Sequence, residues 1–374
     1  MPLVVKSYTQ NDIDAVKAFN RRILAHGDSY ESVVFAEECT PKWLPSDGRR
    51  DTYNEYFLAI EDGVVRGAYA LKHQPFCFQG QETRSVACFH HAVSEGLFVK
   101  RYANVAAFLL KDALRRSPLL YTLGMDGVDK PLPRMLKALG WSLFPVPFYF
   151  RVVRPRSFLR NLQSLRSSRA RRLLSDLAAA TGVGGLAIKM AQAITRQRGP
   201  RMGDYAVEKV PRFSDWCDEI WERSKSSYPW IAIRDKSTLD TFYPERDELF
   251  TRLRVTAGER VLGWAVIGER RTKPRFGSMR VGSIVDALAL PQDAPAVMRA
   301  ATAALEAREV DLIVSNQSHY AWCEALKAAG FLSASSTFIF AASKELARNL
   351  APLEHYRPLI YLNRSDGDGL PRNF

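Results

Sequence analysis

The chain has 374 residues, of which 47% are hydrophobic and 25% charged, and it carries a formal net charge of +13. This length predicts about two domains of roughly 150 residues each, and the composition excludes collagen-like, low-complexity and wholly disordered chains. Its five cysteines show no C-x-x-C pair and no zinc-ligand spacing, and the start of the chain lacks the pattern of a signal peptide. We therefore expect a cytoplasmic protein with reduced thiols and no metal site.

The first half of the chain alternates strand and helix patterns. In chain order we expect a strand at 4–8, a helix at 12–23, a hairpin at 61–70, a long strand at 86–99, a helix at 107–115 and a helix ending within 136–141. Such a layout predicts a mixed sheet covered by helices.

The strand at 86–99 carries the candidate general bases. Strict alternation would place Phe89, His91, Val93, Glu95 and Leu97 on one face, with His91 and Glu95 about 13 Å apart at roughly 3.3 Å per residue. Glu95 is the preferred base because it interrupts an apolar strand just before a turn, and His91 is the second candidate. The alternative for Glu95 is a carboxylate paired with a nearby arginine, or a bulge residue at the surface.

Most of the positive charge lies in one segment. Residues 151–201 contain twelve arginines or lysines and a single acidic residue, Asp176, so this segment carries +11 of the net charge. A helix is expected at about 186–197. The segment is interpreted either as a solvated bridge between two domains or as a basic surface for an anionic membrane or polymer, such as the inner face of the membrane. Nucleic acid is disfavoured because no reader motif accompanies the charge.

The second half repeats the landmarks of the first. They are a strand and helix at 205–210 and 213–224, a hairpin at 257–266 and a helix ending at 326–331. Gly263 lies 196 residues after Gly67, and Leu326 lies 190 residues after Leu136. A near-constant offset indicates an internal duplication.

Several polar residues of the second half are candidates for a site. Asp286 is the single charge on an apolar strand, so it is either paired or poised in a cleft as a catalytic group. Asn316, His319 and Tyr320 follow the next strand, where α/β sheets commonly bind ligands, although helix capping by Asn316 or Ser318 is the alternative. These three residues are candidates for acceptor binding, with Arg234 as a partner for an acidic acceptor.

The sequence is divided into four parts by these patterns. They are an N-terminal domain at 1–153, a basic helical linker at 154–204, a C-terminal domain at 205–343 and a C-terminal extension at 344–374. The end of the extension, around 364–369, is interpreted as a flexible end because it lacks the spaced ligands of a calcium loop.

The order of hairpin, strand, helix, strand, helix and Gly-aromatic pair resembles the GNAT N-acyltransferase superfamily, over about 3–153 and 205–342. Tandem arrangements of this kind also resemble Fem-type aminoacyltransferases and GNAT-like proteins linked to exopolysaccharide synthesis, the latter through the stretch at 234–243. The resemblance implies an α/β (α+β) fold class with two GNAT-like domains, each a mixed, mostly antiparallel sheet covered by helices.

GNAT enzymes hold the pyrophosphate of acyl-CoA in a [RQ]-x-x-G-x-[GA] loop at a helix start. The matching residues in the first half are Arg101, Tyr102, Ala103, Asn104, Val105 and Ala106. Asn104 stands where the first glycine is expected, and Asn adopts left-handed geometry more readily than most residues. In the second half, two prolines and Asp293 at 290–297 argue against phosphate binding.

The resemblance thus implies an acyltransferase that uses acetyl-CoA or another acyl-CoA and acts on a small-molecule, envelope or saccharide acceptor. Leu136 and Leu326 replace the tyrosine that often serves as the general acid of the family. Two alternatives follow: a catalytically silent GNAT-like scaffold or binding protein, and a Fem-like aminoacyltransferase that uses charged tRNA. The acceptor, the acyl group and the oligomeric state are not predicted.

Overall fold

The computed structural model describes residues 2–27, 33–46, 48, 50–161, 183–197, 204–272 and 278–367. The chain forms two compact units, and each takes segments from both halves of the sequence. Unit 1 comprises Met1–Phe76, Thr83–Pro145 and Thr337–Glu354, and unit 2 comprises Cys77–Glu82, Val146–Ser336 and His355–Phe374.

The sheet of unit 1 has the strand order β1-β2-β3-β4-β5-β15-β6. Its strands are β1 (Val4–Ser7), β2 (Tyr53–Glu61), β3 (Val64–Phe78), β4 (Glu82–Ser94), β5 (Leu120–Gly124), β6 (Ser142–Pro145) and β15 (Ile339–Ala342). β4 and β5 run parallel, whereas β1, β2, β3 and the β5-β15-β6 group pair antiparallel with their neighbours.

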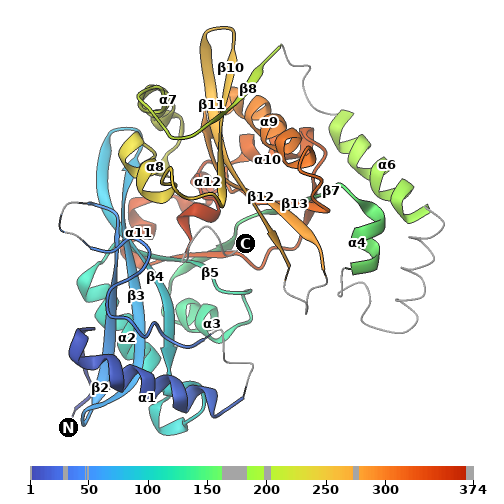
Figure 1. The fold of residues 1–374 in the computed structure, drawn as a ribbon. Coiled ribbons are helices and arrows are strands. Elements are labelled where there is room, and N and C mark those ends of the chain that lie inside the picture. The colour runs from blue at the N-terminus through green and yellow to red at the C-terminus, as the bar shows by residue number, and fades with distance from the viewer. Residues whose placement is uncertain are drawn as a thin grey trace. The chain divides into compact units, whose positions relative to one another are not determined.

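Helices cover both faces of this sheet (Figure 1). They are α1 (Ile13–Leu24), α2 (Val105–Arg116), α3 (Pro131–Ala138) and α11 (Lys344–Asn349). Adjacent side chains of β2 point to opposite faces of the sheet: Leu58 packs with Phe19 of α1, and Ala59 packs with Leu109 of α2. This is the alternation of a strand that is buried on both sides.

The sheet of unit 2 has the order β14-β7-β13-β12-β11-β10-β8. Its strands are β7 (Phe148–Val152), β8 (Ala206–Val210), β10 (Phe250–Ala257), β11 (Arg260–Arg271), β12 (Arg280–Ala289), β13 (Leu312–Asn316) and β14 (Leu332–Ala334). β12 and β13 are parallel and the other pairs are antiparallel. Both sheets are therefore mixed and mostly antiparallel, as the sequence predicted.

Unit 2 also contains the short strand β9 (Trp230–Ala232) and the helices α4 (Pro155–Asn161), α6 (Val183–Gln197), α7 (Trp216–Ser224), α8 (Lys236–Phe242), α9 (Ala294–Glu306) and α10 (Tyr320–Ala328); the short α12 (Leu353–Tyr356) falls where the chain passes from unit 1 to unit 2. α9 packs on the sheet face that bears Gly263 and Gly282. Trp264 faces the other way and meets the ring of Phe213 at 5.2 Å.

Each half of the sequence gives one strand to the other unit. β7 comes from the first half but lies between β14 and β13 of unit 2, and β15 comes from the second half but lies between β5 and β6 of unit 1. These units therefore differ from the contiguous ranges 1–153 and 205–343. Local patterns indicate that a strand exists, whereas its partner is set by non-local pairing.

The hairpins of the two units share one local construction. In β2 and β3 the register shifts directly beside Gly67, and in β10 and β11 it shifts directly beside Gly263. A Cβ on Gly67 would lie 2.8 Å from Val105 of α2, and one on Gly263 would lie 3.0 Å from Val297 of α9. Both glycines thus let the following helix approach the sheet, which supports the duplication.

No helix among the residues placed by the structure is long and apolar enough to cross a membrane.

Candidate functional site

Strands β4 and β5 of unit 1 separate after two paired positions. Their register joins Ala87 to Leu120 and Cys88 to Tyr121, and β5 pairs along its other edge with β15. β3 and β5 are the neighbours of β4 in the sheet. Within the described ranges, no strand therefore pairs with residues 89–94 on the edge of β4 opposite β3, and the backbone donors and acceptors of that edge are left for a ligand. Such an edge can bind an extended ligand through main-chain hydrogen bonds.

The first turn of α2 follows this edge and has no side-chain cap. Asn104 is the N-cap residue, but its side chain accepts no capping hydrogen bond, and the first helical bond joins the Phe108 N–H to the Asn104 carbonyl. Among the described residues, the N–H groups of 105–107 have no acceptor, and Ala103 and Asn104 are exposed. A helix start of this kind attracts anions.

The backbone of Asn104 lies in the ordinary right-handed helical region. Its φ is −81° and its ψ is −10°. The short helical turn η4 (Lys100–Tyr102) leads into α2 without a reversal that needs positive φ. The loop therefore needs no glycine at this position.

The other residues of the predicted loop differ in exposure. Two guanidinium groups lie near the Tyr102 ring, with the Arg66 carbon 4.4 Å and the Arg101 carbon 5.5 Å from its centre. Arg101 is exposed, Ala106 is half-buried and Val105 is buried. The loop thus presents one cation, Arg101, shortly before the uncapped turn.

Glu95 lies in the turn η3 (Glu95–Leu97), just beyond β4, and is 5% exposed. Its Oε1 is 2.5 Å from Nε of Arg22, and its Oε2 is 2.9 Å from a terminal nitrogen of Arg66. Arg22 also donates to the Val65 carbonyl at 2.7 Å. Both carboxylate oxygens are engaged, which is the ion-paired alternative raised from the sequence; a role for Glu95 as a base stays a prediction.

His91 breaks the alternation of β4. Its φ is 48°, and the faces change across it: Phe89 packs in the cluster under α2, and Val93 packs in the cluster under α1. The placement of 89, 91, 93, 95 and 97 on one face was therefore wrong, because the bulge shifts the side-chain pattern by one residue. The His91 Nε2 lies 2.9 Å from the Val34 carbonyl oxygen.

A cluster of polar side chains on the α1 face of unit 1 was missed by the sequence analysis. Asn54 of β2 is in register with Lys72 of β3, and its Oδ1 lies 3.2 Å from Nε2 of His90 on β4. Lys72 and Gln74 are 0% and 1% exposed, and neither amide atom of Gln74 has a partner in the described structure. We call Asn54, Lys72, Gln74 and His90 the polar cluster.

The polar cluster has a sequence signal that could have found it. Lys72 and Gln74 are two polar residues spaced two apart near the end of a long strand, so they share one face. Burial and the neighbouring His91 and Lys72 hold the pKa of His90 well below its usual range. His90 is therefore a neutral imidazole near pH 7, two residues beyond the last β4–β5 pair.

The leucines at the usual general-acid positions are core residues. Leu136 and Leu326 are both 0% exposed, so neither position offers a proton.

In unit 2 the predicted residues Arg234 and Asp286 form a buried ion pair. Arg234 Nε donates to Asp286 Oδ1 at 2.9 Å, and another guanidinium nitrogen donates to both oxygens of Asp366, at 2.9 and 3.0 Å. The Tyr243 hydroxyl donates to Asp286 at 3.1 Å. Burial alone would lower the pKa of Arg234, and the two carboxylates outweigh this and raise it. Asp286 thus takes the paired alternative stated above.

The C-terminal segment joins this network where β12 and β13 separate. The last paired position of these strands joins Ser283 to Val314. Beyond it, the Tyr361 hydroxyl donates to the Ala287 carbonyl, and Asn363 bridges to Gln317 of the segment after β13. In unit 2, protein atoms therefore lie beside β12 beyond its last pair with β13. The equivalent edge in unit 1 is residues 89–94 of β4, beyond the last pair with β5.

The expectation of a flexible end was wrong for the described part of the tail. Tyr361, Asn363 and Asp366 are each 0% exposed. The Asn363 N–H donates a hydrogen bond to Asp366 at 2.9 Å, and the Asn363 side-chain amide donates one to Asp286 at 2.7 Å. The composition of the tail suggested a loop, whereas its polar residues satisfy buried charges. Residues 368–369 of that prediction lie outside the described residues.

The turn before α9 is the counterpart of the loop before α2. Pro295 occupies the second helical position, where it supplies no N–H. The Asp293 carboxylate lies at this helix start and pairs with Arg260 at 3.0 and 3.3 Å.

Two of the residues predicted to bind the acceptor in unit 2, Asn316 and His319, form hydrogen bonds within the protein. Asn316 is buried and donates to the Pro147 carbonyl at 3.3 Å. His319 caps α10, with its Nδ1 accepting from the Ala321 N–H at 3.2 Å, and burial lowers its pKa to about 4. Tyr320 is 52% exposed. A side chain does cap this helix, but the cap is His319, and not Asn316 or Ser318 as the capping alternative had it.

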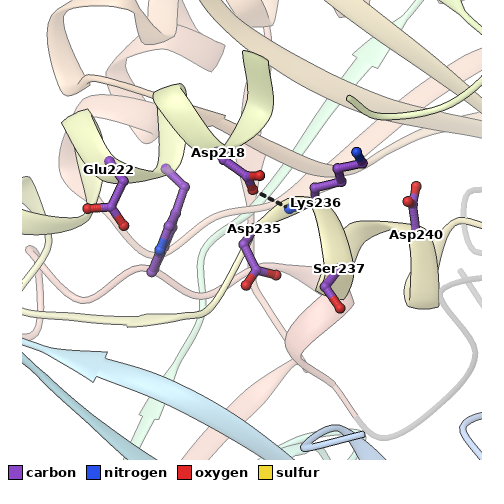
Figure 2. A pocket seen from close by; sticks show the side chains of 7 residues that line it. Asp218, Glu222, Asp235, Lys236, Ser237 and Asp240 are labelled. Atoms are coloured by element: carbon purple, nitrogen blue, oxygen red, sulfur yellow. Dashed lines mark hydrogen bonds between the residues drawn. The ribbon is translucent and has the colours of Figure 1, made fainter. Parts of the chain in front are cut away.

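An open groove of about 440 Å³ lies between α7 and α8 of unit 2 (Figure 2). Four carboxylates line it, from Asp218, Glu222, Asp235 and Asp240. Two of them hold the helices in place: Asp218 accepts from the Lys236 N–H at 2.7 Å, and Asp235 caps α8 by accepting from Thr238 at 2.8 Å. The negative charge of these carboxylates favours the binding of a cation in the groove. Within the described ranges, no group of three or more His, Cys, Asp or Glu side chains is arranged to hold a metal ion.

No family model and no curated protein matches the chain. The fold does match solved structures. One is a GCN5-related N-acetyltransferase from Anabaena variabilis, at a TM-score of 0.50 and 12% identity over 91% of this chain and 72% of the other. Another is the Saccharomyces cerevisiae N-myristoyltransferase with bound myristoyl-CoA and inhibitors, at a TM-score of 0.50 and 11% identity over 92% and 80%. This likeness shows the fold, which is that of two GNAT-like domains.

Proposed function

We propose that this protein is an acyl-CoA-dependent N- or O-acyltransferase that binds its thioester donor in unit 1. The observation that carries the proposal is the combination of an edge of β4 that β5 leaves at residues 89–94 and an uncapped start of α2 at 105–107. The edge suits the amide groups of an extended thioester, and the helix start suits its phosphates. The fold likeness to an N-acetyltransferase and to an N-myristoyltransferase with bound myristoyl-CoA supports it.

Unit 2 serves as the structural half in this proposal. Its equivalent opening is filled by Tyr361 and Asn363, and its equivalent helix start carries Pro295 and Asp293. A second donor site would require removal of buried side chains and of a carboxylate.

The acceptor is proposed to bind at the polar cluster. An acceptor group could satisfy the buried amide of Gln74, whose unpaired atoms otherwise cost about 1–3 kcal/mol each. The Nε2–H of His90 donates to Asn54, which leaves the Nδ1 lone pair free to take a proton from the nucleophile. The nucleophile then bonds to the acyl carbon and the C–S bond breaks. CoA leaves as the thiolate, because Leu136 supplies no acid.

The donor site is tested by calorimetric titration of acetyl-CoA and of a longer acyl-CoA into the Ala106→Pro variant. Proline at the second helical position removes one N–H without breaking the helix, as Pro295 does in α9. The loss of a hydrogen bond to a charged group predicts binding weaker by roughly tenfold or more. Ala106→Gly keeps the N–H and is the matched control. Equal affinity of the two variants would move the donor site elsewhere.

One observation favours a second candidate function, a protein that binds acyl-CoA without turnover. Both oxygens of Glu95 are held by arginines, so the strongest sequence candidate for a base is engaged. Release of free CoA in the presence of a panel of amines and alcohols separates the two. Release that His90→Gln abolishes, with donor binding intact, supports the enzyme; binding with no release supports the silent protein.

A further inference from the structure

Helix α6 lies beside α4 (Figure 1), and one face of it packs on unit 2. Ile188 packs in a cluster with residues of α4, β7 and β13, and the Gln192 side chain accepts from the Val152 N–H at 3.0 Å. Gly185 lets the helix approach α4, since a Cβ there would lie 3.3 Å from Pro155. These contacts set the rotation of α6 about its own axis.

The outer face of α6 carries a row of large apolar side chains. Leu186, Met190 and Ile194 are 61%, 57% and 54% exposed. Their spacing of four residues places them along one side of the helix, and exposed Ala187 and Ala193 lie between them. We call Leu186, Met190 and Ile194 the α6 stripe. Scattered apolar residues on a surface are normal, whereas an aligned row indicates an interaction surface.

Exposed cations lie on α6 beside the α6 stripe and on the neighbouring helix α4. Lys189 and Arg196 are exposed on α6 and lie seven residues apart, so they form a second row beside the stripe. The neighbouring helix α4, which contacts α6, exposes Arg156 and Arg160 four residues apart. The whole of 151–201 holds a single acidic residue, Asp176.

We propose that α6 binds an anionic membrane surface, with the α6 stripe among the acyl chains and the neighbouring cations at the lipid headgroups. The interface of an anionic bilayer offers both chemistries side by side. A nucleic acid would match the cations and leave the apolar row in water. A neutral protein groove would match the row and gain nothing from a segment charge of +11.

The helix lies flat on this surface. Its 15 residues span about 22 Å at 1.5 Å per residue, which is less than the roughly 30 Å of a hydrocarbon core. Its inner face is bonded to β7 through Gln192, so only one side is available to lipid. This proposal is independent of the proposed function, because it uses no residue of the donor or acceptor site.

The test is flotation of the full chain with vesicles of phosphatidylcholine containing about 30% phosphatidylglycerol, next to vesicles of phosphatidylcholine alone. We expect the wild-type chain to float with the anionic vesicles. The triple variant Leu186→Ser, Met190→Ser and Ile194→Ser should bind them at least about tenfold more weakly, since it removes the buried apolar area.

The matched control replaces three exposed apolar residues outside α6. Val128, Leu139 and Leu249 are 52%, 45% and 49% exposed, and their replacement by Ser should leave flotation unchanged. The pair Lys189→Gln and Arg196→Gln should weaken binding to anionic vesicles, with a smaller effect in high salt.

Three results would overturn the proposal. They are failure of the wild-type chain to float, equal flotation of the α6 and control triple variants, and a self-association in the ultracentrifuge that the α6 variant abolishes while vesicle binding persists. The last result would make the α6 stripe a contact between copies of the chain.

Discussion

At the scale of single residues, Arg234 is the point where the buried polar contacts of unit 2 meet. It is 1% exposed and pairs with two carboxylates, Asp286 and Asp366. Its guanidinium also lies 4.9 Å from the centre of the Tyr361 ring. Such a group is a weak source of net stability while intact, but removal of one partner leaves buried charge behind.

Replacement of Arg234 by Met should therefore destabilise unit 2 by about 3–5 kcal/mol, because Asp286 and Asp366 would be left uncompensated. Urea unfolding followed by tryptophan fluorescence measures this, since unit 2 holds buried Trp230, Trp264 and Trp322. The control is Arg260→Met, which breaks a pair whose arginine side chain is 51% exposed and should cost less than about 1 kcal/mol. Equal effects would show that the network is not critical.

His319 gives a prediction for the pH dependence of stability. Burial lowers its pKa from 6.5 to about 4 in the folded chain, so the unfolded chain binds the proton more readily. The neutral His319 contributes fully to the free energy of unfolding above pH 6.5. This contribution, roughly 3 kcal/mol, is lost as the pH falls through 4. The free energy of unfolding should fall less between pH 7 and pH 4.5 in His319→Asn, which keeps a helix-capping side chain. A parallel fall in both proteins would contradict the assignment.

At the scale of elements, the two hairpins depend on glycine to different degrees. A Cβ on Gly263 would lie 2.3 Å from the Leu288 carbonyl oxygen, which is backbone, whereas one on Gly67 would first meet the Val105 side chain at 2.8 Å. Backbone cannot yield without a change in the sheet.

Gly263→Ala is thus expected to destabilise the protein by about 1–3 kcal/mol or more, as overpacking does, and Gly67→Ala is expected to cost less. Chemical denaturation of both variants provides the comparison. A larger loss for Gly67→Ala would mean that α2 is held more tightly on its sheet than α9.

The sequence predicted the order of these elements well, because their apolar periods and turn residues are local. The assignment of side chains to faces failed where a single residue shifts the alternation of a strand. The bulge at His91 inverts the faces beyond it, so Glu95 could not be placed by alternation. The polar cluster was missed for a related reason, since Lys72 and His90 meet only after β3 and β4 are paired. Glu95 and Asp286 are each paired with arginine. The sequence analysis stated an ion pair as an alternative for both residues, but the sequence alone gives no basis for choosing it.

At the scale of the whole molecule, the exchange of β7 and β15 makes each unit depend on both halves of the chain. Unit 1 includes Thr337–Glu354, and unit 2 includes the segment Val146–Ser336, which begins in the first half of the chain. A fragment of residues 1–153 therefore lacks the strand that covers the edge of β5.

We expect this fragment to be insoluble or unfolded when it is produced alone, because an exposed central strand edge promotes aggregation. Two chains cut within 198–203, one carrying 1–200 and the other 201–374, should instead associate and co-purify through a tag on either one. A folded, monomeric 1–153 fragment, judged by circular dichroism and gel filtration, would contradict the exchange.

The proposed function requires unit 1 to hold the thioester donor and unit 2 to leave it unbound. Hydrogen–deuterium exchange with and without acyl-CoA distinguishes the two units, because it reports backbone N–H groups, the proposed donors, segment by segment. We expect slower exchange at 89–108 and no change at 284–298 or 358–366. Protection confined to the segments of unit 2, or no protection at saturating ligand, would contradict it.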